Sequence, residues 1–178
     1  QYNIDTVSDI YEINDGARRG IHVTRTHQDS VIEQIMWFYA DMPKIDFETK
    51  VNWQQIKQIL KVSFPVDINA DKASYEIQFG TIERPTHFNT TWDQAKFEVC
   101  AHKWTDLSER SVGISLLSDS KYGVSCHGKT LGLTLHKSGT HPDARGDQGT
   151  HFFRYALYPH AGSLSEETVQ AAYGFNQQ

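Results

Sequence analysis

The chain has 178 residues, of which 38% are hydrophobic and 12% aromatic, and its formal net charge is -5. This length and apolar content allow a sizeable core, so the fold needs neither disulfides nor a structural metal. The lysines and arginines are spread along the chain and form no basic stripe, which argues against nucleic acid as a partner. No apolar run approaches the roughly 20 residues of a membrane-spanning helix, which argues against a membrane.

Apolar residues recur at every second position in the first half of the chain, as they do in β-strands. Strands are predicted at residues 20–27, 31–40, 44–53 and 59–68. In the third of these, Ile45, Phe47 and Val51 alternate with polar and charged side chains, which is typical of an antiparallel strand with one solvated face. Pro65 has no backbone N–H to donate, so the fourth strand should end, bulge or lie at an edge there.

Residues 52–61 (NWQQIKQILK) fit two structures. Ile56 and Ile59 have the spacing of a helix face. As a strand, the segment continues the alternation of residues 62–66 back to Ile56 and Gln58. We predict a strand.

The rest of the chain continues as short strands and ends in a predicted helix. Residues 74–85 are predicted as one strand with a bulge or bend at Gly80. Further strands, bounded by glycine, proline and Asp-Ser signals, are predicted at residues 95–108, 111–120, 121–128, 129–138 and 150–160. Residues 163–175 are predicted to be helical, with Ser163 or Ser165 as N-cap and acidic residues in the first turn.

About ten strands and one short helix near the C-terminus predict an all-β fold. So many strands are best accommodated by two antiparallel sheets packed face to face, a large antiparallel β-sandwich. No linker-like stretch or internal repeat divides the chain, so residues 1–178 are predicted to form a single domain.

Nine histidines raise the question of a metal site. None shows H-E-x-x-H or a comparable spacing. Four residues of one loop would converge on a metal only if the loop folded that way: His141, Asp143, Asp147 and His151. A solvated loop is the simpler interpretation, and no metal is predicted in this chain.

Other chemical motifs are equally sparse. Cys100 and Cys126 are too few for a disulfide framework, and they are predicted to be free, mostly buried thiols. The chain has no G-x-S-x-G elbow, P-loop or G-x-G-x-x-G. Glu83 and Asp93 could flank a substrate, but a glycosidase needs two carboxyl groups roughly 5 to 9 Å apart, a distance that the sequence does not show. By themselves, the residues predict a β-sandwich of unassigned role.

Two long motifs carry a resemblance to a known family. Residues 64–109 read FPVDINADKASYEIQFGTIERPTHFNTTWDQAKFEVCAHKWTDLSE, and residues 113–160 read GISLLSDSKYGVSCHGKTLGLTLHKSGTHPDARGDQGTHFFRYALYPH. Both resemble the carboxy-terminal β region of bacterial-type α-mannosidases of glycoside hydrolase family 38. The resemblance runs from about Lys44 to Phe175, and its motifs occur in the family's order.

The resemblance implies a galactose-mutarotase-like supersandwich and a role inside a much larger hydrolase. In that family a retaining mechanism uses an Asp nucleophile, an Asp acid/base and a zinc ion, all in an amino-terminal barrel that this chain lacks. The chain is therefore expected to be an excised, non-catalytic domain without zinc or catalytic residues of its own. The implied partners are the catalytic barrel, a following β domain and the α-mannoside substrate of a bacterial, cytoplasmic enzyme. A homo-oligomer is left open.

The segment between Arg84 and Asp93 has two interpretations. As a structural turn, Pro85 fixes the backbone, Trp92 caps the core, and Arg84 is neutralised by Glu83 and Asp93 inside its own loop. As a binding loop, it lines the rim of the mannose pocket. The rim candidates are Arg84, His87, Trp92 and Asp93, with a second group at a predicted turn, Asp119, Lys121 and Tyr122.

Two classes of function follow. The first is a non-catalytic domain that supports the barrel of an α-mannosidase and trims its substrate pocket. The alternative is a free-standing carbohydrate-binding or interaction module that shares the sandwich fold. An upstream barrel with zinc ligands would decide for the first.

Overall fold

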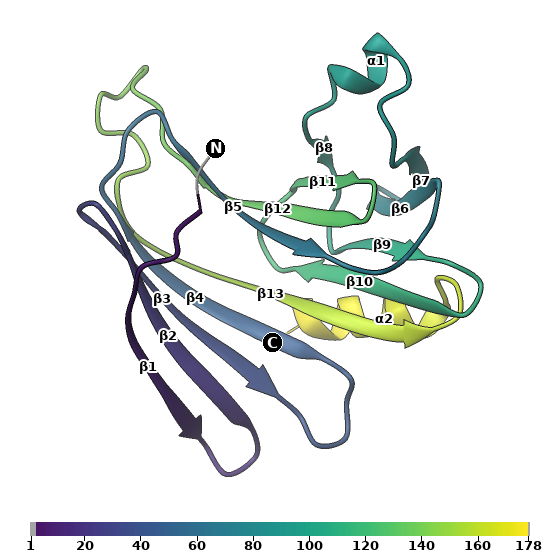
Figure 1. Ribbon diagram of the computed structural model, residues 1–178, viewed down its shortest axis with the longest axis horizontal. Coiled ribbons are helices and arrows are strands. Elements are labelled where there is room, and N and C mark those ends of the chain that lie inside the picture. Colours follow the sequence, from purple (N-terminus) through teal and green to yellow (C-terminus); the bar gives the residue numbers. More distant parts are fainter. Residues whose placement is uncertain (1–2, 178) are drawn as a thin grey trace. The chain divides into compact units, whose positions relative to one another are not determined.

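The computed structural model describes residues 3–177, and antiparallel strands dominate it (Figure 1). The elements in chain order are β1 (Val7–Asn14), β2 (Arg19–His27), β3 (Ser30–Phe38), β4 (Ile45–Trp53), β5 (Ile59–Pro65), β6 (Lys72–Ile77), β7 (Gly80–Pro85), α1 (Thr91–Gln94), β8 (Val99–Cys100), β9 (Trp104–Ser108), β10 (Val112–Ser118), β11 (Gly123–His127), β12 (Thr130–Lys137), β13 (Gly149–Ala161) and α2 (Glu166–Asn176). No helix among residues 3–177 is long and apolar enough to cross a membrane.

The chain divides into two compact units. The first comprises the residues up to 60 together with residues 135–155, and the second comprises residues 61–134 and those from 156 onward. The long strand β13 contributes residues to both units. That residues 1–178 act as one domain stays a prediction.

The first unit contains the strand order β1-β2-β3-β4-β13. Antiparallel pairs join β1 to β2, β2 to β3 and β3 to β4. Phe47 and Tyr155 belong to the buried core of this unit and stack with ring centroids 4.9 Å apart. The buried Tyr155 hydroxyl accepts a hydrogen bond of 2.7 Å from Gln34 Nε2, so the polar end of this aromatic side chain is satisfied.

The second unit contains parts of two sheets. The order β13-β10-β9-β6-β7 belongs to one sheet, and β5-β12-β11-β8 forms the other. The pairs β6/β7, β9/β10 and β11/β12 are antiparallel. Tyr75 and Leu107 of the first sheet, and Leu131 and Leu133 of the second, are buried. The predicted all-β, antiparallel sandwich with a short helix near the C-terminus is confirmed.

Helix α2 explains why both faces of β10 are buried. Successive strand residues point to opposite faces, yet Leu116 and Leu117 are both almost fully buried. Leu117 lies in an apolar cluster with Ala172 and Phe175 of α2, so the helix covers that face of the strand. Ser165 is the N-cap, one of the two predicted alternatives, although its side chain makes no capping hydrogen bond.

Three segments differ from the strands predicted from local residue pattern, because the backbone turns or leaves the sheet within them. Residues 54–58 are neither strand nor helix but connect β4 to β5. Gly80 marks no bend within one strand: Ile77 pairs with Gly80, so a two-residue turn with Phe79 at φ 58° reverses the chain between β6 and β7. The single strand predicted at residues 95–108 is two strands, β8 and β9.

Both cysteines are free, as predicted, but only one of them is buried. Neither cysteine forms a disulfide, and Cys126 is buried, but Cys100 is exposed. Cys100 ends the two-residue strand β8, which is the edge strand of the smaller sheet among residues 3–177.

Candidate functional site

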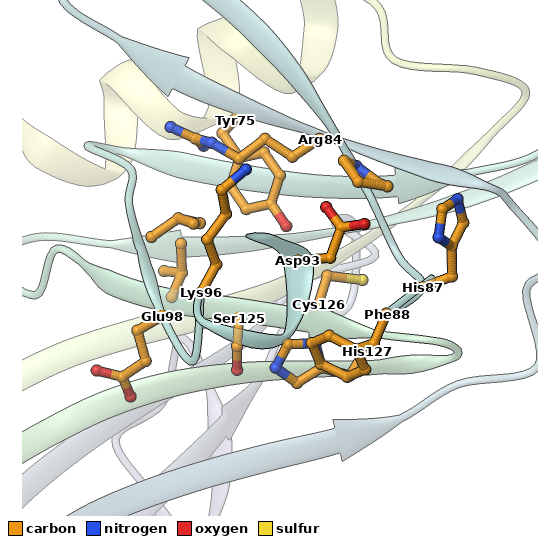
Figure 2. A pocket seen from close by; sticks show the side chains of 13 residues that line it. Tyr75, Arg84, His87, Phe88, Asp93, Lys96, Glu98, Ser125, Cys126 and His127 are labelled. Carbon is orange, nitrogen blue, oxygen red and sulfur yellow. The ribbon is translucent and has the colours of Figure 1, made fainter. Parts of the chain in front are cut away.

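A small pocket lies within the second unit, between β6, β7, β11 and the loop that carries α1 (Figure 2). Its cavity volume is about 30 Å³. Three of the predicted rim residues line it, Arg84, His87 and Asp93. The structure therefore brings these three together around one pocket.

The loop before α1 is held by its backbone and by Thr86. The Thr86 amide donates to the Asp71 carbonyl at 2.9 Å, and its hydroxyl donates to the Ala70 carbonyl at 2.7 Å. The Thr86 carbonyl accepts from the Gly128 amide at 2.7 Å, which ties the loop to the β11–β12 turn. Since Thr86 is buried and fully bonded, the neighbouring His87 and Phe88 project from a fixed backbone.

Asp93 serves mainly as a helix cap. Its Oδ2 accepts hydrogen bonds from the Thr90 amide at 3.2 Å and from the Thr90 hydroxyl at 2.7 Å. The Asp93 amide donates to Thr90 Oγ1 at 3.1 Å, which completes a capping box. This pairing explains how a four-residue helix that buries none of its side chains still forms.

Arg84 is not neutralised inside its own loop, contrary to the structural interpretation of the sequence. Glu83 pairs with Lys72 at 3.0 Å instead, and Asp93 is engaged by Thr90. The Arg84 guanidinium lies over the ring of Tyr75, 4.6 Å from its centroid, as in a cation–π contact. Arg84 Nη1 is buried and has no hydrogen-bond partner in the described chain.

The Tyr75 hydroxyl and the Cys126 thiol, which both line the pocket, stay protonated at neutral pH. Burial raises the pKa of the Tyr75 hydroxyl far above its ordinary value, and the nearby Arg84 only partly opposes this. Burial also raises the pKa of the Cys126 thiol to about 12, with a further contribution from the charge of Asp106. Neither group is therefore prepared to act as a base or a nucleophile.

Trp92 does not cap the core, which corrects the prediction. It lies on α1 and is 78% exposed. The helix is stabilised by its capping box and buries none of its side chains, so the indole makes no core contact. Trp92 is also absent from the pocket lining.

Asp119, Lys121 and Tyr122 occupy the turn between β10 and β11, as predicted, but they do not line the pocket. The turn is fixed locally, because the Lys121 amide donates to Ser118 Oγ at 3.0 Å. Partial burial lowers the pKa of Lys121, and Asp119 partly offsets that effect. The ring of Tyr122 lies edge-on to His102, with centroids 5.7 Å apart. The two predicted groups of rim residues thus do not share one pocket.

Sequence reasoning missed several lining residues, among them Tyr75, Lys96, Glu98, Cys126 and His127. Glu98 pairs with Lys61 at 2.6 Å and also accepts a hydrogen bond from Thr134. Phe88 lies against His127, with ring centroids 4.2 Å apart. Tyr75 comes from β6, Cys126 and His127 come from β11, and Lys96 and Glu98 lie between α1 and β8, so only a correct strand pairing could have brought the strand residues to this loop.

The segment that contains His141, Asp143, Asp147 and His151 does not fit a zinc site. Within residues 3–177 there is no group of three or more His, Cys, Asp or Glu side chains able to hold a metal ion. His136 Nε2 and His151 Nε2 lie 2.6 and 3.0 Å from the same backbone carbonyl, that of Asp147. Zinc requires three or four ligands, so no chemistry is assigned to a metal in this chain.

Comparisons with known proteins place these features in a family. The model of the glycosyl hydrolases family 38 C-terminal domain matches residues 1–145. The chain is 54% identical over 138 residues to an alpha-mannosidase of Saccharomyces cerevisiae, covering 77% of this chain and 13% of that protein. It is 50% identical over 135 residues to alpha-mannosidase 2C1 of Homo sapiens, covering 75% of this chain and 13% of that protein.

The fold is also that of a solved structure. The crystal structure of an alpha-mannosidase from Enterococcus faecalis superposes with a TM-score of 0.81 at 14% identity, over 96% of this chain and 24% of that one. The chain spans only about an eighth of the length of the two curated relatives, since it covers 13% of each. Because the family model covers most of the chain and the sandwich fold agrees, the chain belongs to the family of glycosyl hydrolases family 38 C-terminal domains.

Proposed function

We propose that this chain is the non-catalytic, carboxy-terminal β domain of an α-mannosidase that releases terminal α-mannosyl residues with retention. The observation that carries this proposal is the 54% identity to a protein named alpha-mannosidase over 77% of the chain. In the family, the Asp nucleophile, the Asp acid/base and zinc belong to an amino-terminal barrel. The zinc and the chemistry of the whole enzyme are therefore assigned to that barrel, and this domain supports it.

Apolar surface supports packing against further domains. In the second unit, Phe79, Trp92 and Phe97 are at least 78% exposed. Large exposed aromatic side chains are suited to burial against another protein surface. We propose that this surface packs against the catalytic barrel, a following β domain or a second copy of the chain. A bacterial source and a cytoplasmic location complete the proposal on the strength of the family resemblance alone.

A part in carbohydrate binding is proposed for the pocket lined by Arg84, His87 and Asp93. Guanidinium, imidazole and carboxylate groups all bond well to sugar hydroxyls. The cavity of about 30 Å³ is too small to enclose a sugar ring. These residues would therefore touch the edge of a mannoside whose ring lies elsewhere.

Hydrolysis of an aryl α-mannoside tests whether catalysis requires the barrel or occurs in this domain. We expect the 178-residue chain alone to be inactive and to bind no stoichiometric zinc. The longer protein that contains it should be active, and a chelator should abolish that activity. Turnover by the 178-residue chain that a chelator abolishes would contradict the proposal.

A binding measurement separates the alternative, a free-standing carbohydrate-binding module. Calorimetric titration of the 178-residue chain with methyl α-mannoside should give no saturable heat if the domain only supports a barrel. Saturable binding by the isolated chain, together with unchanged turnover when the domain is removed from a longer enzyme, would favour the binding module.

A further inference from the structure

We propose that Arg84 and Lys96 make the pocket of the second unit a binding site for a single carboxylate group. This inference is an alternative to the sugar contact proposed for Arg84 and does not depend on the rest of the proposed function, because the group that it names is an anion and a mannoside is neutral. It rests on three features of the pocket: unpaired positive charge, a buried donor without an acceptor, and a cavity of limited size.

The first feature is the charge that remains once the existing pairs are formed. The carboxylate of Glu98 is paired with Lys61 at 2.6 Å. Asp93 accepts two hydrogen bonds from Thr90. Lys96 is exposed, and within residues 3–177 its side chain has no carboxylate partner. Arg84 and Lys96 thus line the pocket without an ion pair to an acidic group of the described chain, and the carboxylates of Asp93 and Glu98 line the same pocket.

The second feature is Nη1 of Arg84, which has no acceptor and which no water molecule can reach in this conformation, so an incoming carboxylate must shift the side chain to bond it. Withdrawing a charged donor from water without giving it a partner is costly. The Tyr75 ring lies 4.6 Å from Arg84 Cζ, but it accepts no hydrogen bond from the edge of the guanidinium. A carboxylate matches that edge, because its two oxygens can accept two parallel N–H bonds from one guanidinium.

The third feature is size. A cavity of about 30 Å³ has room for one or two water-sized groups. A carboxylate head fits such a space, whereas ligand pockets that enclose a whole small molecule measure roughly 300 to 1,000 Å³. Burial keeps the Tyr75 hydroxyl and the Cys126 thiol protonated by raising the pKa of each, so neither adds negative charge. Figure 2 shows the Tyr75 hydroxyl at the end of the ring that lies toward Asp93, so it is not among the donors expected for an anion beside Arg84.

Asp93 limits where the anion can sit. Its carboxylate lines the same pocket and would repel a second carboxylate. The Thr90 hydroxyl and amide hold Oδ2. The incoming group is therefore expected on the side of Arg84 and Lys96, away from Asp93.

Two sources could supply the same chemistry. One is a free small acid, and the other is an Asp or Glu side chain from another part of a longer protein that contains this domain. Both would place a carboxylate against Arg84, so the site is defined by that group, and the experiments distinguish the sources.

Acetate is the probe for the site. In the ¹⁵N-labelled 178-residue chain, titration with sodium acetate against sodium chloride at constant ionic strength should move the Arg84 Nε–Hε signal saturably. Arg84→Gln and Lys96→Gln should each weaken acetate binding about tenfold. Lys50→Gln is the matched control, because it removes the same charge from an exposed ion pair with Glu33 and should leave binding unchanged. Lys96 is exposed, so its variant tests the site even if Arg84→Gln fails to fold.

A crystal structure of the longer protein grown in acetate distinguishes the sources. An Asp or Glu side chain against Arg84 identifies the occupant as part of the protein, and acetate in that place identifies a site for free acids. The proposal is overturned if acetate gives no saturable shift with the 178-residue chain. Unchanged affinity in both glutamine variants, or a longer protein whose pocket holds neither group, would overturn it as well.

Discussion

The buried carboxylate of Asp106, in the second unit, accepts hydrogen bonds from three side chains. Its Oδ1 accepts from the Ser108 hydroxyl at 2.7 Å, and its Oδ2 accepts from the Ser115 hydroxyl at 2.6 Å and from His160 Nε2 at 2.7 Å. Gly113 makes room for this arrangement, because a Cβ there would lie 2.2 Å from His160 Cε1. One carboxylate thus joins the adjacent strands β9, β10 and β13 through side chains.

Removing that carboxylate should be strongly destabilising. Asp106→Ala leaves the two hydroxyls and His160 Nε2 buried without their acceptor, and the expected loss is about 3 kcal/mol in the free energy of unfolding. Urea unfolding monitored by tryptophan fluorescence measures it. The exposed Asp41→Ala is the control and should change stability by less than about 0.5 kcal/mol. A loss for Asp106→Ala as small as the control's would mean that the network contributes little to stability.

The two thiols should differ in reactivity, because the thiolate is the reactive form. Cys100 is exposed, whereas Cys126 is 3% exposed and its pKa is raised to about 12. Iodoacetamide at mildly alkaline pH should therefore modify one thiol per native chain and two per chain in urea, as counted by mass spectrometry. Cys100→Ser should show almost no modification while native. Rapid labelling of Cys126 in that variant would show that the strand opens readily.

At the scale of the element, prediction from sequence succeeded where a strand has one buried face. In β4, buried Phe47 and Val51 alternate with more exposed polar side chains, so the period of two was visible. Strand β1 was not assigned, because it is exposed almost throughout and burial imposes no pattern on it. The β6–β7 hairpin was missed because Phe79, not a glycine, takes the positive φ of the turn.

The site was predictable only in part for a related reason. Arg84, His87 and Asp93 lie within ten residues of one another, so their polar crowding was visible in the sequence. Tyr75 and Cys126 reach the same pocket from β6 and β11, and no local pattern links these strands. Lys96 lies close to this group in the sequence, but only the structure shows which nearby acidic side chains are already paired.

Two tryptophans, one on α1 and one in the cluster that α2 covers, compare the stability contributed by an exposed and a buried indole. Trp92 on α1 is 78% exposed, while Trp104 is 2% exposed in the cluster that α2 covers. Trp104→Ala should cost about 3 to 5 kcal/mol of unfolding free energy, and Trp92→Ala less than about 1 kcal/mol. Chemical denaturation of both variants measures the contrast. A large loss for Trp92→Ala would restore the interpretation that this residue caps the core.

At the scale of the whole molecule, this domain is a small part of the proteins that it resembles, covering 13% of two alpha-mannosidases. A residue such as Arg84 can therefore matter to a longer enzyme in two ways. It can touch substrate at the rim of the active site, or it can bind a carboxylate that fixes one domain against another. The two roles place its effect in different measurements.

Arg84→Gln in the longer protein separates these roles. If Arg84 binds a carboxylate from elsewhere in the protein, the melting temperature should fall, and kcat/KM per folded molecule should stay within about twofold of the parent enzyme. If it touches the mannoside, the melting temperature should stay unchanged while kcat/KM falls, and each tenfold loss corresponds to about 1.4 kcal/mol of transition-state stabilisation.

Lys50→Gln controls for the lost charge, and His87→Ala tests a second pocket residue that takes no part in the proposed carboxylate site. We expect the first outcome for Arg84, because its buried Nη1 needs a full-time acceptor, and a substrate present only during turnover cannot provide one.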